Sequence, residues 1–203
     1  MVKKHAATKE VIEFCGWNFL LELVESTKSE FHQGLVATLF ETGGRISEVL
    51  SLTKRNFDFN AHPELIIVRK MPILKRFQKV GERKDGKWIT VKVKEFRTFP
   101  ILKREPLVPY MTKWVKLCPY NKLFPITRVT AYLIVKRLGK KLGVEIYPHW
   151  FRAQRACQLA EEYGFDVYSL REFFGWRSRK TDIAERYASL GWRGLARRMG
   201  VQA

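Results

Sequence analysis

The chain has 203 residues, of which 46% are hydrophobic and 29% charged, so it can bury the core of one domain and is not a disordered tail. Its 38 Lys and Arg against 20 Asp and Glu give a net charge of +18, which is typical of proteins that bind a polyanion such as nucleic acid. The three cysteines (Cys15, Cys118 and Cys157) are far apart, which disfavours a disulfide framework and a thiolate zinc site.

The N-terminal region carries no sequence of the length that a membrane span requires. Its apolar stretch from Val11 to Val24 is interrupted by Glu13, Asn18 and Glu22, and a span needs roughly 18 apolar residues. Unpaired cysteines are also typical of a reducing compartment. We therefore expect a cytoplasmic protein without membrane contact.

The first part of the chain has the apolar spacing of helices. This spacing predicts helices over about 9–25 and 29–42, followed after Gly43 and Gly44 by a short helix that starts around Arg45. Residues 57–63 contain Asp, Asn and Pro and are predicted to form a loop.

Between residues 65 and 101 the apolar residues recur every second position, as in a strand. Alternating and β-branched residues flank Asp85-Gly86, a two-residue turn signal, and so predict a long antiparallel hairpin with an irregularity at Met71-Pro72. Between Arg69 and Arg104 there are 13 Lys or Arg and three acidic residues. The predicted hairpin therefore holds more than half of the net charge.

After Pro106 and Pro109 the helical spacing returns. Helices are predicted over about 110–117, 127–142, 149–163, 167–174 and 180–190, with Gly143 and Gly164 as stop signals, followed by a basic tail. The sequence contains no internal repeat, so it predicts a single domain of the α+β class, mainly helical with a small antiparallel sheet.

Two arginines have unusual surroundings. Arg45 follows Thr42-Gly43-Gly44 at a predicted helix start, and Arg152 lies near the start of another in Pro148-His149-Trp150-Phe151-Arg152. A guanidinium group binds phosphate oxygens in a bidentate manner, and a helix N-terminus adds backbone donors to the same anion. The alternative is that both are ordinary surface arginines.

Further side chains fall beside these arginines or later in the chain. Glu48 lies one helical turn from Arg45, where it either orients the arginine or forms a surface ion pair, and His149 lies one turn before Arg152. Taken alone, a histidine is more often structural than catalytic, and the neighbouring Arg152 changes this only slightly. By themselves, Tyr187 is an ordinary core aromatic and Trp176 a core or rim aromatic.

The order and spacing of the whole set resemble the tyrosine recombinase (phage integrase) family over roughly residues 30–190. Thr-Gly-Gly-Arg-Ile-Ser-Glu at 42–48 is followed by a basic hairpin, then by His149-x-x-Arg152, Gly175-Trp176 and Tyr187. Arg152 comes 107 residues after Arg45, Trp176 comes 24 after Arg152, and Tyr187 comes 11 after Trp176. The resemblance implies the fold of the DNA breaking-rejoining enzymes.

The resemblance also implies a chemistry. Arg45 and Arg152 would hold the scissile phosphate, and Tyr187 would attack it to give a 3′-phosphotyrosyl bond and a free 5′-hydroxyl. His149 would bind the phosphate and assist with the phenol proton. Trp176 stands where many members have a second histidine, and its indole cannot titrate. Neither a metal nor a nucleotide cofactor is implied.

The family places a general-acid lysine in the hairpin, and several lysines compete for that role here. Lys75 in Ile73-Leu74-Lys75-Arg76 is our choice, because it lies 30 residues after Arg45. Lys70, Lys79 and Lys92 are the alternatives.

The sequence departs from the family pattern in two further ways. Ala153-Gln154-Arg155 replaces a common His-Thr pair, so a supporting contact is lost or taken over by Gln154 or Arg155. Residues 1–28 are expected to be a helical lead-in and 191–203 a tail that packs on a neighbouring protomer or on its own domain. We expect no separate N-terminal core-binding domain.

The expected function is that of a site-specific recombinase or integrase, with double-stranded DNA as partner and self-association on it into a dimer or tetramer. The alternatives are a type IB topoisomerase, which shares the chemistry, and a decayed integrase that binds DNA without cutting it. Tyr187 separates cutting from binding, because replacing it by Phe removes only the nucleophile.

Overall fold

The computed structural model of the protein describes residues 14–84, 87–176 and 199–201. Within these ranges, seven α-helices and a three-stranded antiparallel sheet of order β1-β2-β3 confirm the predicted α+β class. The elements are α1 (Trp17–Glu25), α2 (Glu30–Thr42), α3 (Ile46–Val49), a 3-10 turn η1 (Lys54–Asn56), β1 (Phe57–Asp58), β2 (Leu65–Lys84), β3 (Lys87–Leu102), α4 (Val108–Leu117), α5 (Arg128–Lys141), α6 (Pro148–Tyr163) and α7 (Val167–Phe174).

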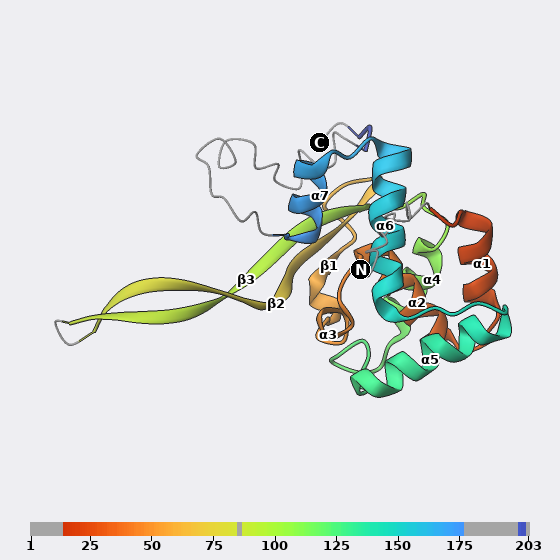
Figure 1. Ribbon diagram of the computed structural model, residues 1–203, viewed down its shortest axis with the longest axis horizontal. Coiled ribbons are helices and arrows are strands. Elements are labelled where there is room, and N and C mark those ends of the chain that lie inside the picture. Colours follow the sequence, from red (N-terminus) through yellow and green to blue (C-terminus); the bar gives the residue numbers. More distant parts are fainter. Residues whose placement is uncertain (1–13, 85–86, 177–198, 202–203) are drawn as a thin grey trace, which may run out of the picture.

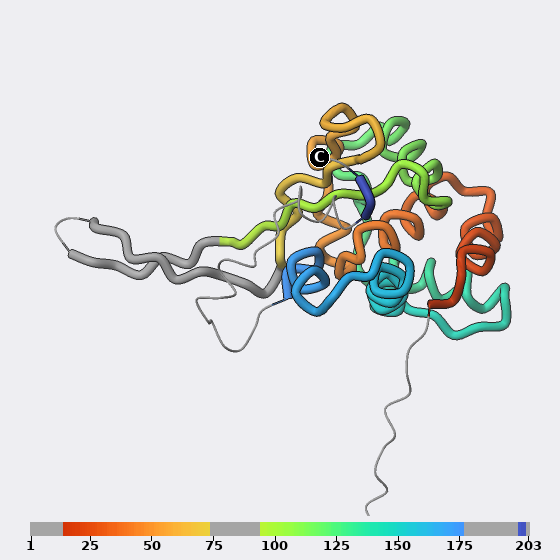
Figure 2. Tube along the Cα trace, turned by 90° about the horizontal axis from the view of Figure 1, so that it is seen from above, coloured from red at the N-terminus to blue at the C-terminus, as the bar shows by residue number. Residues whose placement is uncertain are grey.

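Helix α2 is the centre of the helical body. It begins at Ser29, whose hydroxyl accepts a hydrogen bond from the N–H of His32, and every residue from Gly34 to Thr42 is buried. Its flanks contact α4 and α6, and Figure 2 shows it between these two helices. Because α2 is buried from Gly34 onward, its C-terminal end places the following residues in the interior of the molecule.

Strands β2 and β3 form the predicted hairpin, which extends away from the helices (Figure 1). Their pairing runs from Leu65 opposite Leu102 to Lys84 opposite Lys87, and β1 adds a short third strand by pairing with β2. The register shifts between Val68 and Met71 and again between Pro72 and Phe77. Proline cannot donate to a strand ladder, so the irregularity expected at Met71-Pro72 is confirmed.

The loop predicted for residues 57–63 is wrong at its beginning. Phe57 and Asp58 form β1, which pairs with Val68 and Ile67 of β2. The buried ring of Phe57 holds this segment against the edge of β2. Asp58 also accepts two hydrogen bonds from the guanidinium group of Arg69. The edge of the sheet is thereby covered where it meets the helices.

The core joins the helices to the base of the hairpin. Phe99 and Ile101 of β3 are fully buried against apolar side chains of the helices. Near the end of the chain, Met199 and Val201 are also buried in this core, so these two residues pack on their own domain. The predicted helix over 180–190 lies outside the described residues. Within the described ranges, no helix is both long and apolar enough to cross a bilayer.

Candidate active site

The turn between α2 and α3 places Arg45 beside the base of the hairpin. Gly43 ends α2 in the left-handed region (φ 53°), and a Cβ there would lie 2.2 Å from Cε1 of Phe174. A Cβ on Gly44 would lie 2.4 Å from the methyl group of Met71. The two glycines therefore allow α7 and β2 to approach this turn closely, and the Arg45 side chain that follows is 39% exposed.

Glu48 binds both the backbone and the side chain of Arg45. Its carboxylate accepts hydrogen bonds from the backbone N–H and from Nη1 of Arg45, both at 2.9 Å, and lies 3.9 Å from Nη1 of Arg152. Glu48 is only 1% exposed, so the alternative of a surface ion pair is wrong. One buried carboxylate thus connects the two arginines that the sequence analysis selected.

Arg152 is buried on α6 and points at the turn after α2. Its Nη1 donates to the carbonyl oxygen of Gly43 (2.6 Å) and its Nη2 to that of Phe174 (3.0 Å). The guanidinium carbon lies 4.7 Å from the ring centroid of Phe174 and 5.5 Å from that of Trp176. The alternative of an ordinary surface arginine is therefore wrong for Arg152, which joins α6, the α2–α3 turn and the end of α7.

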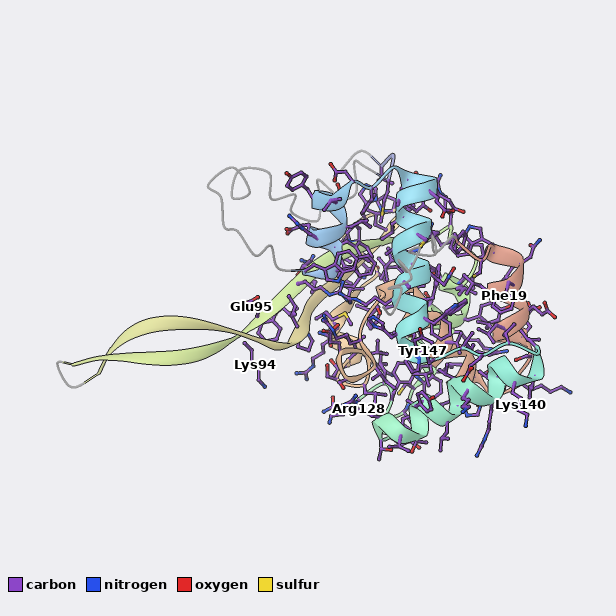
Figure 3. All side chains as sticks on the ribbon, in the orientation of Figure 1. Phe19, Lys94, Glu95, Arg128, Lys140 and Tyr147 are labelled. Carbon is purple, nitrogen blue, oxygen red and sulfur yellow. The ribbon has the colours of Figure 1, made fainter. Side chains whose placement is uncertain are left out.

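His149 lies one helical turn before Arg152 and is exposed. Partial burial, the charge of Arg152 and the charge of Arg45 lower its pKa below the ordinary value of 6.5. The ring is therefore neutral at pH 7 and able to accept a proton. It borders a hollow at the junction of α5 and α6, where Figure 3 shows Arg128 and Tyr147.

Trp176 follows α7 directly. Gly175 ends the helix in the left-handed region (φ 63°), and a Cβ there would lie 2.6 Å from Cδ1 of Ile73 in β2. The indole stacks on Phe174 with ring centroids 4.7 Å apart and is 37% exposed. Trp176 therefore lies at the edge of the cluster, over the guanidinium group of Arg152.

Two of the six predicted residues have no described side chain. Lys75 lies in β2, in the irregular stretch between Pro72 and Phe77, but its side chain is outside the described part of the structure. Tyr187 lies outside the described residues altogether. The other four, namely Arg45, His149, Arg152 and Trp176, are brought together from three separate stretches of the chain.

The sequence analysis missed a third arginine in this cluster. Arg97 of β3 is 6% exposed, and its Nη2 donates to the carbonyl oxygen of Thr42 at 3.0 Å. Its strand position could have revealed it. Arg97 has the same two-residue phase as the buried residues Phe99 and Ile101, so strand alternation alone directs its side chain inward.

The residues that replace the family's His-Thr pair serve the scaffold. Gln154 accepts a hydrogen bond from the backbone N–H of Cys15 (2.7 Å), which fastens the segment before α1 to α6. Arg155 is fully buried and donates to Glu105 (2.9 Å), while Glu41 lies 3.5 Å away. Burial and the neighbouring Glu105 raise the pKa of Glu41 well above its ordinary value. These contacts of Gln154 and Arg155 thus fix α6 against the rest of the domain.

The donor set of the cluster favours an anion over a metal ion. Its charged groups are the guanidinium groups of Arg45, Arg97 and Arg152 and the carboxylate of Glu48. Among the residues with described side chains, no three His, Cys, Asp or Glu lie together as metal ligands would. A phosphate is the anion for which several guanidinium groups are suited.

The phage integrase family model matches residues 17–190 of the chain. Among curated proteins, the tyrosine recombinase XerA of Saccharolobus solfataricus is 38% identical over 61 residues, which is 30% of this chain and 21% of that protein.

Solved structures of recombinases have the same fold. XerA recombinase gives a TM-score of 0.53 at 19% identity, over 88% of this chain and 60% of that one. XerH bound to its difH substrate before cleavage gives 0.54 at 16% identity, over 90% and 51%. An integrase from mycobacterium phage Brujita gives 0.57 at 14% identity, over 99% and 61%. The chain thus spans about half to three fifths of the length of these solved relatives.

Proposed function

Because the chain belongs to the phage integrase family, we propose that it is a site-specific DNA recombinase that cuts and rejoins strands through a covalent 3′-phosphotyrosyl intermediate. The observation that carries this proposal is the convergence of Arg45 and Arg152 on the buried Glu48, with His149 close enough for the charges of both arginines to lower its pKa. These side chains come from regions more than 100 residues apart, and together they form a cationic site for one phosphodiester.

The two arginines would bind the non-bridging oxygens of the scissile phosphate. Negative charge on these oxygens increases as the phosphorus becomes five-coordinate, so a fixed guanidinium group stabilises the transition state more than the bound substrate. Glu48 keeps Arg45 in place before DNA arrives. Because the side chain of Arg45 is already ordered, the reaction does not incur the entropic cost of fixing it.

Tyr187 would supply the nucleophile. Its phenolic oxygen forms a bond to phosphorus while the bond from phosphorus to the 5′-oxygen breaks. The phenol proton goes to the neutral ring of His149, and the leaving 5′-oxygen takes a proton from Lys75. In the reverse reaction, a 5′-hydroxyl of another strand attacks the phosphotyrosine and gives its proton to Lys75, while the departing phenolate takes back the proton held by His149. The energy of the phosphodiester bond is thereby conserved. Trp176 would pack over Arg152 without any proton transfer.

The basic hairpin would extend the contact with double-stranded DNA. Lysine and arginine on a projecting element neutralise backbone phosphates without selecting a sequence. We propose that residues 1–203 form a single catalytic domain, which acts on DNA in the cytoplasm and assembles there as a dimer or tetramer.

The proposal is tested by trapping the covalent adduct. The protein is incubated with a pool of nicked duplexes of randomised sequence, and the denatured mixture is separated by electrophoresis so that the adducts can be recovered and sequenced. We expect an adduct with the wild type and none with Tyr187→Phe, which keeps the ring and should bind the pool equally well. An equal absence of adduct in both proteins would leave a DNA-binding module.

A supercoiled plasmid that lacks the recovered sequence distinguishes a recombinase from a type IB topoisomerase, which shares the chemistry. A recombinase leaves this plasmid supercoiled, since it cuts only at its own site. Relaxation of the plasmid by the wild type but not by Tyr187→Phe would instead identify a topoisomerase.

A further inference from the structure

Arg97 connects three segments at the base of the hairpin. From β3 its guanidinium group donates to the carbonyl oxygens of Phe173 and Thr42, and Nη2 lies 3.4 Å from the sulfur of Met71. The guanidinium carbon also lies 4.4 Å above the ring of Phe99. A single side chain therefore ties the end of α2 and the end of α7 to the sheet.

Arg97 and Arg152 bind neighbouring carbonyl groups in both of these segments. Arg97 takes Thr42 and Phe173, and Arg152 takes the residues that follow each of them, Gly43 and Phe174. The α2–α3 turn and the end of α7 are thus joined by two parallel guanidinium bridges. Arg45 lies three residues after Thr42, so its position depends on the same turn.

The burial of Arg97 is electrostatically unfavourable. Burial, the charge of Arg152 and the charge of Arg45 lower its pKa to about 9, and only Glu48 opposes them. Its Nε atom is buried without a hydrogen-bond partner among the described residues. Uncompensated buried groups of this kind lower stability, so their presence calls for a functional reason.

An anion in the site would supply that reason. Arg45, Arg97 and Arg152 together face one carboxylate, that of Glu48, which leaves an excess of two positive charges. A phosphodiester carries one negative charge, and its five-coordinate transition state carries two. The arginine cluster therefore matches the charge of the transition state better than that of the bound substrate.

We propose that Arg97 is a positioning residue of the phosphate site, which holds Arg45 and Arg152 at the spacing that one phosphodiester requires; this inference rests on the function proposed above. Arg97 acts through the two segments that it bridges, without touching the DNA. Its loss should slow the cleavage step and leave DNA binding intact.

The test compares single-turnover adduct formation on the recovered duplex. Arg97→Lys keeps the charge but lacks the planar fork that spans both carbonyl oxygens, so we expect cleavage about tenfold to a hundredfold slower with an unchanged Kd. In Arg97→Ala, added guanidinium ion at low concentration should restore part of the rate, and methylammonium ion should not. A merely structural residue would not give this split between rate and binding.

Lys103→Met is the matched control. Lys103 is also a half-buried cation that donates to two backbone carbonyl groups, those of Phe59 (2.9 Å) and His62 (3.0 Å), but it directly follows the last residue of β3 and binds the segment after β1. We expect this variant to lower the Tm to a similar extent without slowing cleavage.

Several results would overturn the inference. They are a wild-type rate in Arg97→Lys, a loss of rate matched by a loss of binding, and an equal loss of rate in Lys103→Met. Failure of Arg97→Lys to unfold cooperatively would assign Arg97 to the fold and overturn it as well. If the wild type forms a Tyr187-dependent adduct, each of these results concerns Arg97 alone. If the wild type forms none, the proposed function fails first, and this inference fails with it.

Discussion

Nη1 of Arg152 donates a 2.6 Å hydrogen bond to the carbonyl oxygen of Gly43, which lies 109 residues earlier in the chain. This bond joins α6 to the turn that presents Arg45. The carbonyl group points at Arg152 because Gly43 has a positive φ, a conformation that few other residues adopt without strain. The relative position of the two arginines that we propose as phosphate ligands therefore depends on one glycine.

Replacing Gly43 by Ala should both destabilise the protein and stop cleavage. A left-handed alanine costs about 1–2 kcal/mol, and the added Cβ would lie 2.2 Å from the ring of Phe174, which must move. Gly143→Ala is the control, since Gly143 also has a positive φ (72°) but no heavy atom within 4 Å of an added Cβ. Urea unfolding and adduct formation measure both. Equal effects of the two substitutions would contradict the close approach of α7.

Glu48→Gln should remove the carboxylate that connects Arg45 and Arg152. Breaking a buried ion pair leaves an uncompensated charge, so we expect a loss of about 3 kcal/mol in the free energy of unfolding and a clearly slower cleavage step. Glu30→Gln is the control, because Glu30 pairs with Lys113 on the surface (44% and 57% exposed) and should change stability by less than about 1 kcal/mol. The prediction is wrong if Glu48→Gln cleaves at the wild-type rate.

The rate of cleavage should fall on the acid side as His149 becomes protonated. Burial, Arg152 and Arg45 lower its pKa below 6.5, so in the free protein the fall should be centred below pH 6.5. Because folding lowers this pKa, the contribution of His149 to stability is complete above pH 6.5 and is lost as the pH falls through the folded value. The pH dependence of adduct formation measures the effect.

His149→Gln should lose this acid limb, and His32→Gln should keep it. His32 is a suitable control because burial and the charges of Arg137 and Lys141 lower its pKa in the same direction. It lies at the start of α2, at the opposite end from Gly43. Persistence of the limb in His149→Gln would exclude His149 as the proton acceptor.

Lys75→Met should slow cleavage by about 10²–10⁴-fold, the usual contribution of a general acid. A duplex with sulfur in place of the leaving 5′-oxygen should be cut by this variant at the wild-type rate, because a thiolate leaves without a proton. Lys79→Met is the comparison, since Lys79 lies further along β2 in a regular stretch, paired with Lys92. If sulfur restores the rate of Lys79→Met instead, the general acid is Lys79.

The sequence by itself determined most of the elements, and it selected Arg45, His149, Arg152 and Trp176, which the structure brings together. Lys75 and Tyr187 stay predictions. Helical spacing predicted α2 and α5 to within a residue or so, since their apolar faces repeat locally. Strand alternation around Asp85-Gly86 predicted the hairpin, and Pro72 its irregularity. The pairing of Phe57 and Asp58 was missed, because so short a strand has no period of its own and depends on the edge of β2. The helix predicted over about 9–25 is wrong at residues 14–16, since α1 begins at Trp17.

The tertiary structure decided how the charged groups of the site are related. Nothing local distinguishes a buried Glu48 from a surface ion pair at the same spacing, and Arg97 stood among 13 basic residues of the hairpin region. The role of Glu48 follows from its burial between Arg45 and Arg152. That of Arg97 follows from its bonds to the distant carbonyl groups of Thr42 and Phe173. Spacing along the chain selects residue types, whereas the shared desolvation of side chains from distant segments exists only once those segments have packed together.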